Sequence, residues 1–139
     1  MTYDPTLPWR TVQGGGFNDH IGPVRFAQVG EGDYRFALRL EDRHMNATGV
    51  AHGGLLMSLA DTGMGTAAFT AAGERPVATI DFECDFIAPG KNGQMLHGQA
   101  RVVRKARELL FMQGDIHADS RHVLRASGIW VIRSGGGKP

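Results

Sequence analysis

The stretch RHMNATGVAHGGLLMSLAD, residues 43–61, places polar groups that could do chemistry at the start of an apolar segment. They are Asn46, the run His52-Gly53-Gly54, and Asp61. A helix that starts at a glycine leaves backbone N–H groups without partners and carries a partial positive charge, and both attract a carbonyl or an anion. A carboxylate beside a bound carbonyl can serve as nucleophile or general base. These residue types therefore indicate attack on a carbonyl compound.

The spacing within this stretch predicts how the groups can meet. Asp61 follows Gly54 by seven residues, close to two helical turns, so it lies on the same face about 10 Å further along the axis. One chain therefore cannot bring its own Asp61 to its own Gly53 amide. If both groups act on one carbon atom, they come from two helices, and a two-fold dimer with antiparallel helices supplies this pairing twice. The motif predicts a homodimer with its sites at the interface.

The elements that must position these groups follow from the hydrophobic patterns. Runs 24–29 and 33–40 flank a glycine-bearing turn and predict an antiparallel hairpin. The segment from Gly54 to about Ala71 predicts one long helix, apolar nearly all round and therefore enclosed by other elements. Strand-like runs follow at 77–87, about 94–104, 108–117 and 122–132. This order predicts an α+β fold in which an antiparallel β-sheet wraps around one long central helix.

Two glycines, Gly63 and Gly65, stand inside the predicted helix. Each costs on the order of 1 kcal/mol relative to Ala in a helix interior. Together with Ala60, Ala67 and Ala68 they predict that another backbone approaches the helix closely.

Length and composition limit the remaining possibilities. The 139 residues predict one working domain at 17–133, after a lead-in at 1–16 and before a flexible tail at 134–139. The 15 basic and 14 acidic side chains leave a net charge of +1, so no overall field attracts nucleic acid. The single cysteine, Cys84, allows no internal disulfide. The sequence shows neither a leader pattern nor a run of about 18 apolar residues, so we expect a cytoplasmic protein away from membranes.

The pattern as a whole resembles one known family. Asn46 precedes His52 by six residues, His52-Gly53-Gly54 follows Gly49, and Asp61 lies nine residues after His52. This arrangement resembles the hotdog-fold acyl-CoA thioesterases, in particular the phenylacetate-pathway type and the related human thioesterase superfamily members. The resemblance covers about residues 17–133 and includes Asp81 and Pro89. It implies a hotdog fold, a homodimer or a tetramer, no cofactor and no metal, and hydrolysis of an acyl-CoA thioester to a carboxylic acid and coenzyme A.

The resemblance also implies roles for single residues. The amide of Gly53 polarises the thioester carbonyl, and Asp61 of the partner subunit attacks it or activates water. Asn46 orients the water or the substrate, while His52 holds the loop or assists at the thioester. Thr79 takes the place of a hydroxyl that positions the nucleophilic water. Strict strand alternation puts Thr79 on the face away from the helix, so its reach depends on twist or a bulge.

Substrate contacts are less closely specified. For the acyl group we expect Gly54 and apolar side chains near the interface, namely Leu56, Met57, Met64 and Phe82. For the coenzyme A phosphates the densest basic cluster offers Arg101, Arg104, Lys105 and Arg107, of which we choose Arg104 and Lys105. The competing interpretation is a solvated hairpin end, and Ala106 stands where the family often has glycine. Aryl, short-chain and medium-chain acyl groups all remain open.

Other kinds of site are possible in principle. Asp115, His117, Asp119 and His122 have residue types that suit a metal, but they fall at a predicted hairpin where polar side chains are expected. Cys84 on an apolar strand face is better explained as a small buried hydrophobe than as a nucleophile. The alternative functions are a hotdog enoyl-CoA hydratase or dehydratase, and an acyl-CoA binding module without catalysis.

Overall fold

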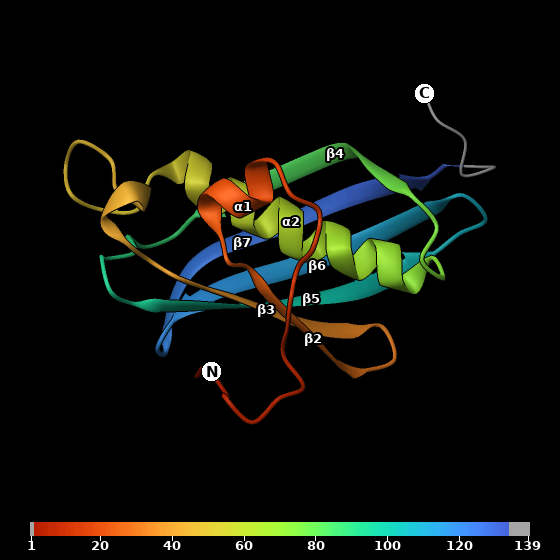
Figure 1. The fold of residues 1–139 in the computed structure, drawn as a ribbon. Coiled ribbons are helices and arrows are strands. Elements are labelled where there is room, and N and C mark those ends of the chain that lie inside the picture. The colour runs from red at the N-terminus through yellow and green to blue at the C-terminus, as the bar shows by residue number, and fades with distance from the viewer. Residues whose placement is uncertain (1, 134–139) are drawn as a thin grey trace.

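The computed structural model describes residues 2–133, so the tail predicted at 134–139 lies outside the described residues. A seven-stranded antiparallel sheet curves around the long helix α2, and the short helix α1 lies against α2 on the side away from the sheet (Figure 1). The elements in chain order are β1 (Arg10–Thr11), α1 (Phe17–Ile21), β2 (Arg25–Gly30), β3 (Asp33–Arg39), η1 (Asp42–His44), α2 (Gly53–Ala71), β4 (Val77–Phe86), β5 (Met95–Lys105), β6 (Leu109–Ala118) and β7 (Arg121–Ile132).

The strand order in the sheet is β1-β2-β3-β5-β6-β7-β4. Helix α2 therefore connects β3 to β4 at the far edge, and within the described residues 2–133 β4 pairs on one side only, with β7. The long helix and its six companion strands begin and end within one residue of their predicted bounds. The predicted α+β fold, with an antiparallel sheet wrapped around one central helix, is confirmed.

Aromatic rings fill the space beside the helix glycines. A Cβ added at Gly63 would lie 2.3 Å from Cγ of Phe36, and one added at Gly98 would lie 2.2 Å from Cζ of the same ring. At Gly65 the nearest atom would be Nε1 of Trp130, at 3.3 Å. The prediction that another backbone comes close here is wrong, because the glycines make room for side chains from the sheet.

The outer face of α2 is not enclosed by its own chain. Met57 and Phe69 are 39% and 36% exposed, and Asp61 and Thr62 are half-buried. The expectation of a helix enclosed on all sides therefore fails for a single chain, which leaves an apolar face for another surface to cover. No helix within residues 2–133 has the length and apolar character needed to cross a membrane.

The segment predicted as a lead-in is ordered around Trp9. Strand β1 pairs with β2, and the Trp9 indole N–H donates to the Asp4 carbonyl oxygen at 2.8 Å. The Tyr3 ring stacks on Trp9 with 5.4 Å between ring centroids. Residues between 10 and 18 then pass over α2, so this segment contributes to the surroundings of Asp61.

Candidate active site

Asp61 and Thr79 make the central polar contact of the candidate site. Asp61 lies on the half-exposed face of α2, and Thr79 lies on β4. The Thr79 hydroxyl donates a hydrogen bond to Asp61 Oδ1, with 2.7 Å between the two oxygens. Within residues 2–133 no other hydrogen bond to this carboxylate is recorded. One carboxylate oxygen is therefore held in place while the other is available to a bound molecule.

A β-bulge at Ile80 brings Thr79 to the helix. Thr79 pairs with Trp130, and Asp81 pairs with the residue just before Trp130 on β7, so Ile80 is the extra residue. A bulge shifts the alternation of side chains by one position. Thr79 and Phe82 therefore both lie on the α2 side of the sheet, where Phe82 packs against the core and Thr79 is exposed, while Ile80 on the other face is 57% exposed.

The start of α2 presents an unused backbone donor. His52 is the N-cap residue, and its Nδ1 accepts a hydrogen bond from the Gly54 N–H at 2.8 Å. Gly53 is the first helical residue, and within residues 2–133 no acceptor is recorded for its N–H. The ring of Phe86 lies beside it, because a Cβ added at Gly53 would be 3.4 Å from Phe86 Cε1. A ligand carbonyl can therefore reach this N–H as its acceptor.

Asn46 braces the loop that leads to the helix. Its Oδ1 accepts hydrogen bonds from the Thr48 N–H at 2.9 Å, the Thr48 hydroxyl at 2.8 Å and the Val50 N–H at 3.2 Å. Gly49 within the loop has φ +83°, in the left-handed region that favours glycine. These contacts fix the backbone just before His52. The predicted contact of Asn46 with water or substrate stays a prediction.

A hollow of about 610 Å³ opens beside Asp61, and we call it the Asp61 hollow. Helix α2 lines it with Asp61, Gly65 and Phe69, which share one face at four-residue spacing. Thr79 lines it from β4, and Trp130 lines it from β7. The carboxylate thus stands at a cavity with a partly apolar wall, the kind of site that binds small organic groups.

The N-terminal segment forms another wall of the Asp61 hollow, a role for which the sequence analysis made no provision. Asn18 on α1 lines the hollow, and its Oδ1 accepts a hydrogen bond from the Thr62 hydroxyl at 3.0 Å. Arg10 and Gln13 lie at the same wall and are exposed. Helix α1 has only five residues, too few for a hydrophobic period to be recognised.

A second hollow of about 510 Å³ lies at the start of α2, and we call it the His52 hollow. His52, Gly54 and Ser58 line it from the helix side, and Phe17 and His20 line it from α1. Helix α1 therefore stands between the two hollows and contributes to both.

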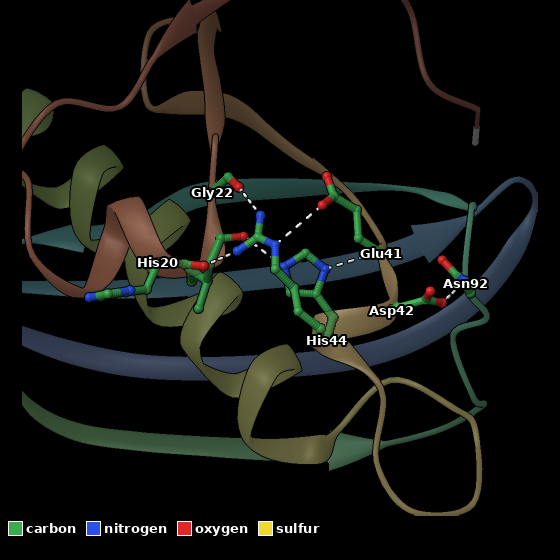
Figure 2. Close-up of polar contacts among 8 residues, drawn as sticks. His20, Gly22, Glu41, Asp42, His44 and Asn92 are labelled. Atoms are coloured by element: carbon green, nitrogen blue, oxygen red, sulfur yellow. Dashed lines mark hydrogen bonds and ion pairs between the residues drawn. The ribbon is translucent and has the colours of Figure 1, made fainter.

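Two residues of η1 hold α1 in this place (Figure 2). The Arg43 guanidinium donates to the carbonyl oxygens of His20 and Gly22. Buried His44 donates from Nε2 to the Ile21 carbonyl oxygen at 2.8 Å. The last turn of α1 is thus fastened to the segment that precedes the Asn46 loop. The sequence analysis assigned no role to either residue.

The two chemical groups of the site lie apart within one chain. Gly53 and Asp61 are eight residues apart on one helix, which corresponds to about 12 Å along its axis. Asp61 borders one hollow, whereas His52 and Gly54 border the other. Each chain therefore presents one carboxylate and one backbone donor at different places.

The residues predicted to contact the acyl group occupy different surroundings. Leu56 and Met64 are buried in the core at 3% and 0% exposure, whereas Met57 is exposed on the outer face of α2. Phe82 is half-buried and packs edge-to-face against Trp130, with 6.0 Å between ring centroids. Their roles toward a substrate stay predictions.

The predicted basic contacts lie at the end of β5. Arg104 and Lys105 are both exposed there, next to a register shift in the pairing with β6. Within residues 2–133 neither side chain forms a recorded ion pair with an acidic group. Both are therefore accessible to an anion, and their contact with phosphates stays a prediction.

The cysteine is held in its thiol form. Burial raises the pKa of Cys84 to about 11, and the negative charges of Asp85 and Asp61 add to the effect. The thiolate, which is the reactive form, is therefore scarce at neutral pH.

The residues considered for a metal form a stack of rings. His122 donates from Nε2 to Asp115 Oδ1 at 2.8 Å, and His117 lies nearly parallel to His122 with 4.7 Å between centroids. Parallel rings do not direct their nitrogens to one point. In the part of the chain that the structure describes, no group of three His, Cys, Asp or Glu side chains is arranged to hold a metal ion.

Two similar structures carry the same fold. The chain superimposes with a TM-score of 0.76 on a mutant phenylacetic acid degradation protein PaaI from Thermus thermophilus, with 21% identity, covering 84% of this chain and 98% of that one. A thioesterase protein from Streptococcus pneumoniae, crystallised with coenzyme A, gives a TM-score of 0.72 with 21% identity, covering 79% and 85% of the two chains. These likenesses establish the hotdog fold.

Sequence comparison gives the family. A Pseudomonas aeruginosa protein whose name proposes an esterase is 34% identical over 115 residues, which are 82% of this chain and 86% of that one. Human acyl-coenzyme A thioesterase 13 is 25% identical over 112 residues, 81% of this chain and 80% of that one. The sequence pattern that defines the thioesterase superfamily matches residues 48–124, which include the start of α2, Asp61 and Thr79. The chain therefore belongs to the thioesterase superfamily.

Proposed function

We propose that this protein hydrolyses an acyl-CoA thioester to a free carboxylic acid and coenzyme A, at a site shared between two copies of the chain. The observation that carries the proposal is the division of the site. Asp61, held by Thr79, and the unused Gly53 N–H are both accessible, yet they lie at different places on one helix. The name of the human relative and the coenzyme A bound to the pneumococcal protein support an acyl-CoA substrate.

The surface of the chain supports a homodimer. Strand β4 is an edge of the sheet formed by residues 2–133, and no strand of that part of the chain pairs with its outer side. Ile80, Phe86 and Ile87 on and after this strand are 57%, 53% and 47% exposed. Pairing of β4 with β4 of a second copy about a two-fold axis would continue the sheet and set the two α2 helices antiparallel. Asp61 of one copy would then face the start of α2 of the other.

In the proposed reaction the Gly53 N–H donates to the carbonyl oxygen of the thioester. Negative charge collects on this oxygen when the carbonyl carbon is attacked, so a fixed donor stabilises the transition state more than the ground state. The positive end of the α2 dipole acts in the same direction. His52 keeps the donor available, because its own bond is made with Gly54 rather than Gly53.

The carboxylate completes the chemistry in one of two ways. As a general base, Asp61 takes a proton from water while the water oxygen forms a bond to the carbonyl carbon. The carbon–sulfur bond then breaks, and the departing thiolate takes up a proton. As a nucleophile, an Asp61 oxygen bonds to the carbonyl carbon, the carbon–sulfur bond breaks and the departing thiolate takes up a proton, and water then hydrolyses the resulting mixed anhydride to the acid and free Asp61. In both cases the Thr79 hydroxyl orients the carboxylate.

The remaining contacts of the proposal concern the substrate. Arg104 and Lys105 are proposed to bind the phosphates of coenzyme A, since both are exposed cations at one sheet end. Asn46 is proposed to orient the loop and, through it, the water or thioester. Association of two dimers into a tetramer is compatible with the same shared site.

A panel of aryl, short-chain and medium-chain acyl-CoA thioesters, assayed for release of free thiol, tests the activity. We expect release with at least one thioester and a fall of about a hundredfold or more in kcat for Asp61→Asn. Hydration of an enoyl-CoA without thiol release would instead assign a hydratase. Binding of thioesters with no turnover would assign a binding module.

Complementation between two inactive variants tests the shared site. Asp61→Asn removes the carboxylate, and Gly53→Pro removes the N–H. A mixed dimer then has one site with Asp61 and Gly53 both intact, so a random one-to-one mixture should recover about a quarter of wild-type activity. Failure to recover activity in verified mixed dimers would place the whole site within one chain.

A further inference from the structure

The indole ring of Trp130 is held in one orientation beside the Asp61 hollow. Trp130 is 1% exposed, and its six-membered ring covers Gly128, where an added Cβ would lie 2.7 Å from Cζ3. Phe82 packs edge-to-face against the ring with 6.0 Å between centroids. Nε1 faces Gly65, where an added Cβ would lie 3.3 Å away. The direction of the indole N–H is therefore set by packing.

This N–H has no acceptor among the residues that the structure describes. Within residues 2–133 no hydrogen bond is recorded for Trp130 Nε1, in contrast to Trp9, whose N–H donates to Asp4. Within residues 2–133 the one fully buried side-chain polar atom without a partner is His117 Nδ1, so Trp130 Nε1 keeps some access to the hollow, where a ligand that displaces water without offering an acceptor would leave the N–H unpaired. Because Trp130 and Gly65 both line the Asp61 hollow, a molecule bound there can provide the missing acceptor.

The position of the donor relative to Asp61 indicates where that acceptor must be. Asp61 and Gly65 are four residues apart on α2, so they share a face and are separated by about 6 Å along the helix axis. An acyl group whose carbonyl carbon lies at Asp61 and whose far end points toward Phe69 passes Gly65 on its way. An acceptor about 6 Å beyond the carbonyl carbon then meets the indole N–H.

We infer that Trp130 makes this protein selective for acyl groups that carry a hydrogen-bond acceptor, a keto or hydroxyl oxygen, at that distance from the thioester carbonyl. The inference rests on the proposed thioesterase function and specifies its substrate. A site that donates to a substrate oxygen rejects the analogue lacking it, because the donor is then left unpaired. Gly65 is required for this selectivity, since any side chain at that position would cover the Trp130 N–H.

The other polar groups of the Asp61 hollow distinguish less strongly between acyl groups with and without an acceptor oxygen. Arg10 and Gln13 are exposed, so water competes for their donors. The oxygen of the Asn18 amide already accepts from Thr62. Trp130 is only 1% exposed as a residue, so a bound acyl group can cut its N–H off from water more completely than those of exposed Arg10 and Gln13, and this imposes the strongest requirement on the acyl group.

A matched pair of thioesters tests the inference. 5-Oxohexanoyl-CoA and 5-methylhexanoyl-CoA have similar shape and differ in the acceptor oxygen. We expect wild-type kcat/KM to be about tenfold or more higher for the oxo compound. Trp130→Phe and Gly65→Ala should each bring the ratio close to one, the first by removing the N–H and the second by covering it. Trp9→Phe, a change in the other tryptophan of the chain, should keep the wild-type ratio.

The outcomes separate this inference from the proposed function. A wild-type ratio near one, or an unchanged ratio in a folded Trp130→Phe or Gly65→Ala protein, overturns the inference and leaves the hydrolase intact. If neither these two thioesters nor any member of the panel is hydrolysed, the proposed function fails, and calorimetric binding of the two compounds to the Asp61→Asn protein then tests the inference about Trp130. Tighter binding of the oxo compound that is lost on adding Gly65→Ala supports selection by Trp130, and equal binding of the two compounds rejects it.

Discussion

Thr79 donates its hydroxyl hydrogen to Asp61 across the gap between β4 and α2, with 2.7 Å between oxygens that belong to residues 18 positions apart. The contact exists because Ile80 is bulged out of the pairing between β4 and β7. Bulges often turn a side chain toward a site in this way. The bulge in β4 thus has a structural consequence, because it places the Thr79 hydroxyl where it can donate to the Asp61 carboxylate.

Thr79→Val should lower kcat for acyl-CoA hydrolysis by about tenfold to a hundredfold, because valine keeps the shape but cannot orient the Asp61 carboxylate. Thr79→Ser keeps a hydroxyl and should retain most of the activity. Steady-state kinetics with thiol detection checks both variants, with melting temperatures as a control for folding. Equal activity of the valine and serine variants would remove Thr79 from the mechanism.

Gly53→Pro should abolish the proposed oxyanion donor without breaking the helix. Proline is favoured at the first helical position, where the N–H has no intrahelical partner. His52, which would precede it, has φ −59° and ψ 133°, a conformation that suits a residue before proline. We expect kcat to fall by about a hundredfold or more, with the helical circular dichroism signal unchanged.

Gly53→Ala is the matched control for the proline variant. It keeps the N–H, and its Cβ would be 3.4 Å from Phe86 Cε1, an ordinary contact distance. The alanine variant should therefore retain much more activity than the proline variant. Comparable activities for the two variants would show that the Gly53 N–H does not act on the thioester.

The regular elements could be predicted from the sequence because their signals are local. The alternation in β4 and the uninterrupted apolar run of α2 are visible within single segments. The relation between Gly53 and Asp61 is also local, since helix geometry fixes how far apart they lie. The division of the site between two chains was predicted on the same basis and awaits its test.

The features that were missed depend on contacts between distant segments. The run containing Ile80 alternates regularly, so the sequence analysis could name a bulge only as one condition for Thr79 to reach the site and could not place it at Ile80. The orientation of Trp130 depends on Gly128 and Gly65, which lie on different elements. Spacing rules within one segment cannot detect such arrangements. The expected approach of a backbone at Gly65 was wrong for the same reason.

Gly63→Ala should destabilise the fold, although the same change usually stabilises an exposed helix by about 1 kcal/mol. The new Cβ would lie 2.3 Å from Cγ of fully buried Phe36, whose ring is also seated against Gly98. We expect the free energy of unfolding to fall by roughly 1–3 kcal/mol or more, measured by urea denaturation. Ser58→Ala on the same helix is the control and should change stability much less. A Gly63→Ala protein of wild-type stability would contradict the described packing of Phe36.

Three histidines are stacked on the sheet face away from α2. His117 lies between His97 and His122, with centroid distances of 5.8 and 4.7 Å, and its Nδ1 is buried without a partner within residues 2–133. Burial lowers the pKa of His117 from its ordinary value of 6.5, and the charges of His122 and His97 lower it further, while Asp115 opposes the shift. Burial likewise lowers the pKa of His97.

Acid should therefore weaken the fold through this stack. Since the pKa of His117 is lower in the folded than in the unfolded chain, the unfolded chain binds more protons as the pH falls through about 6.5, and stability declines below that value. Replacing His117 by Phe keeps a ring in the stack and removes one titrating group, so the loss of melting temperature between pH 7.5 and pH 5 should be smaller than in wild type. His20→Phe, which changes an exposed histidine outside the stack, should leave that loss unchanged. If His117→Phe and wild type lose the same melting temperature between pH 7.5 and pH 5, protonation of His117 does not contribute to the acid sensitivity of the fold.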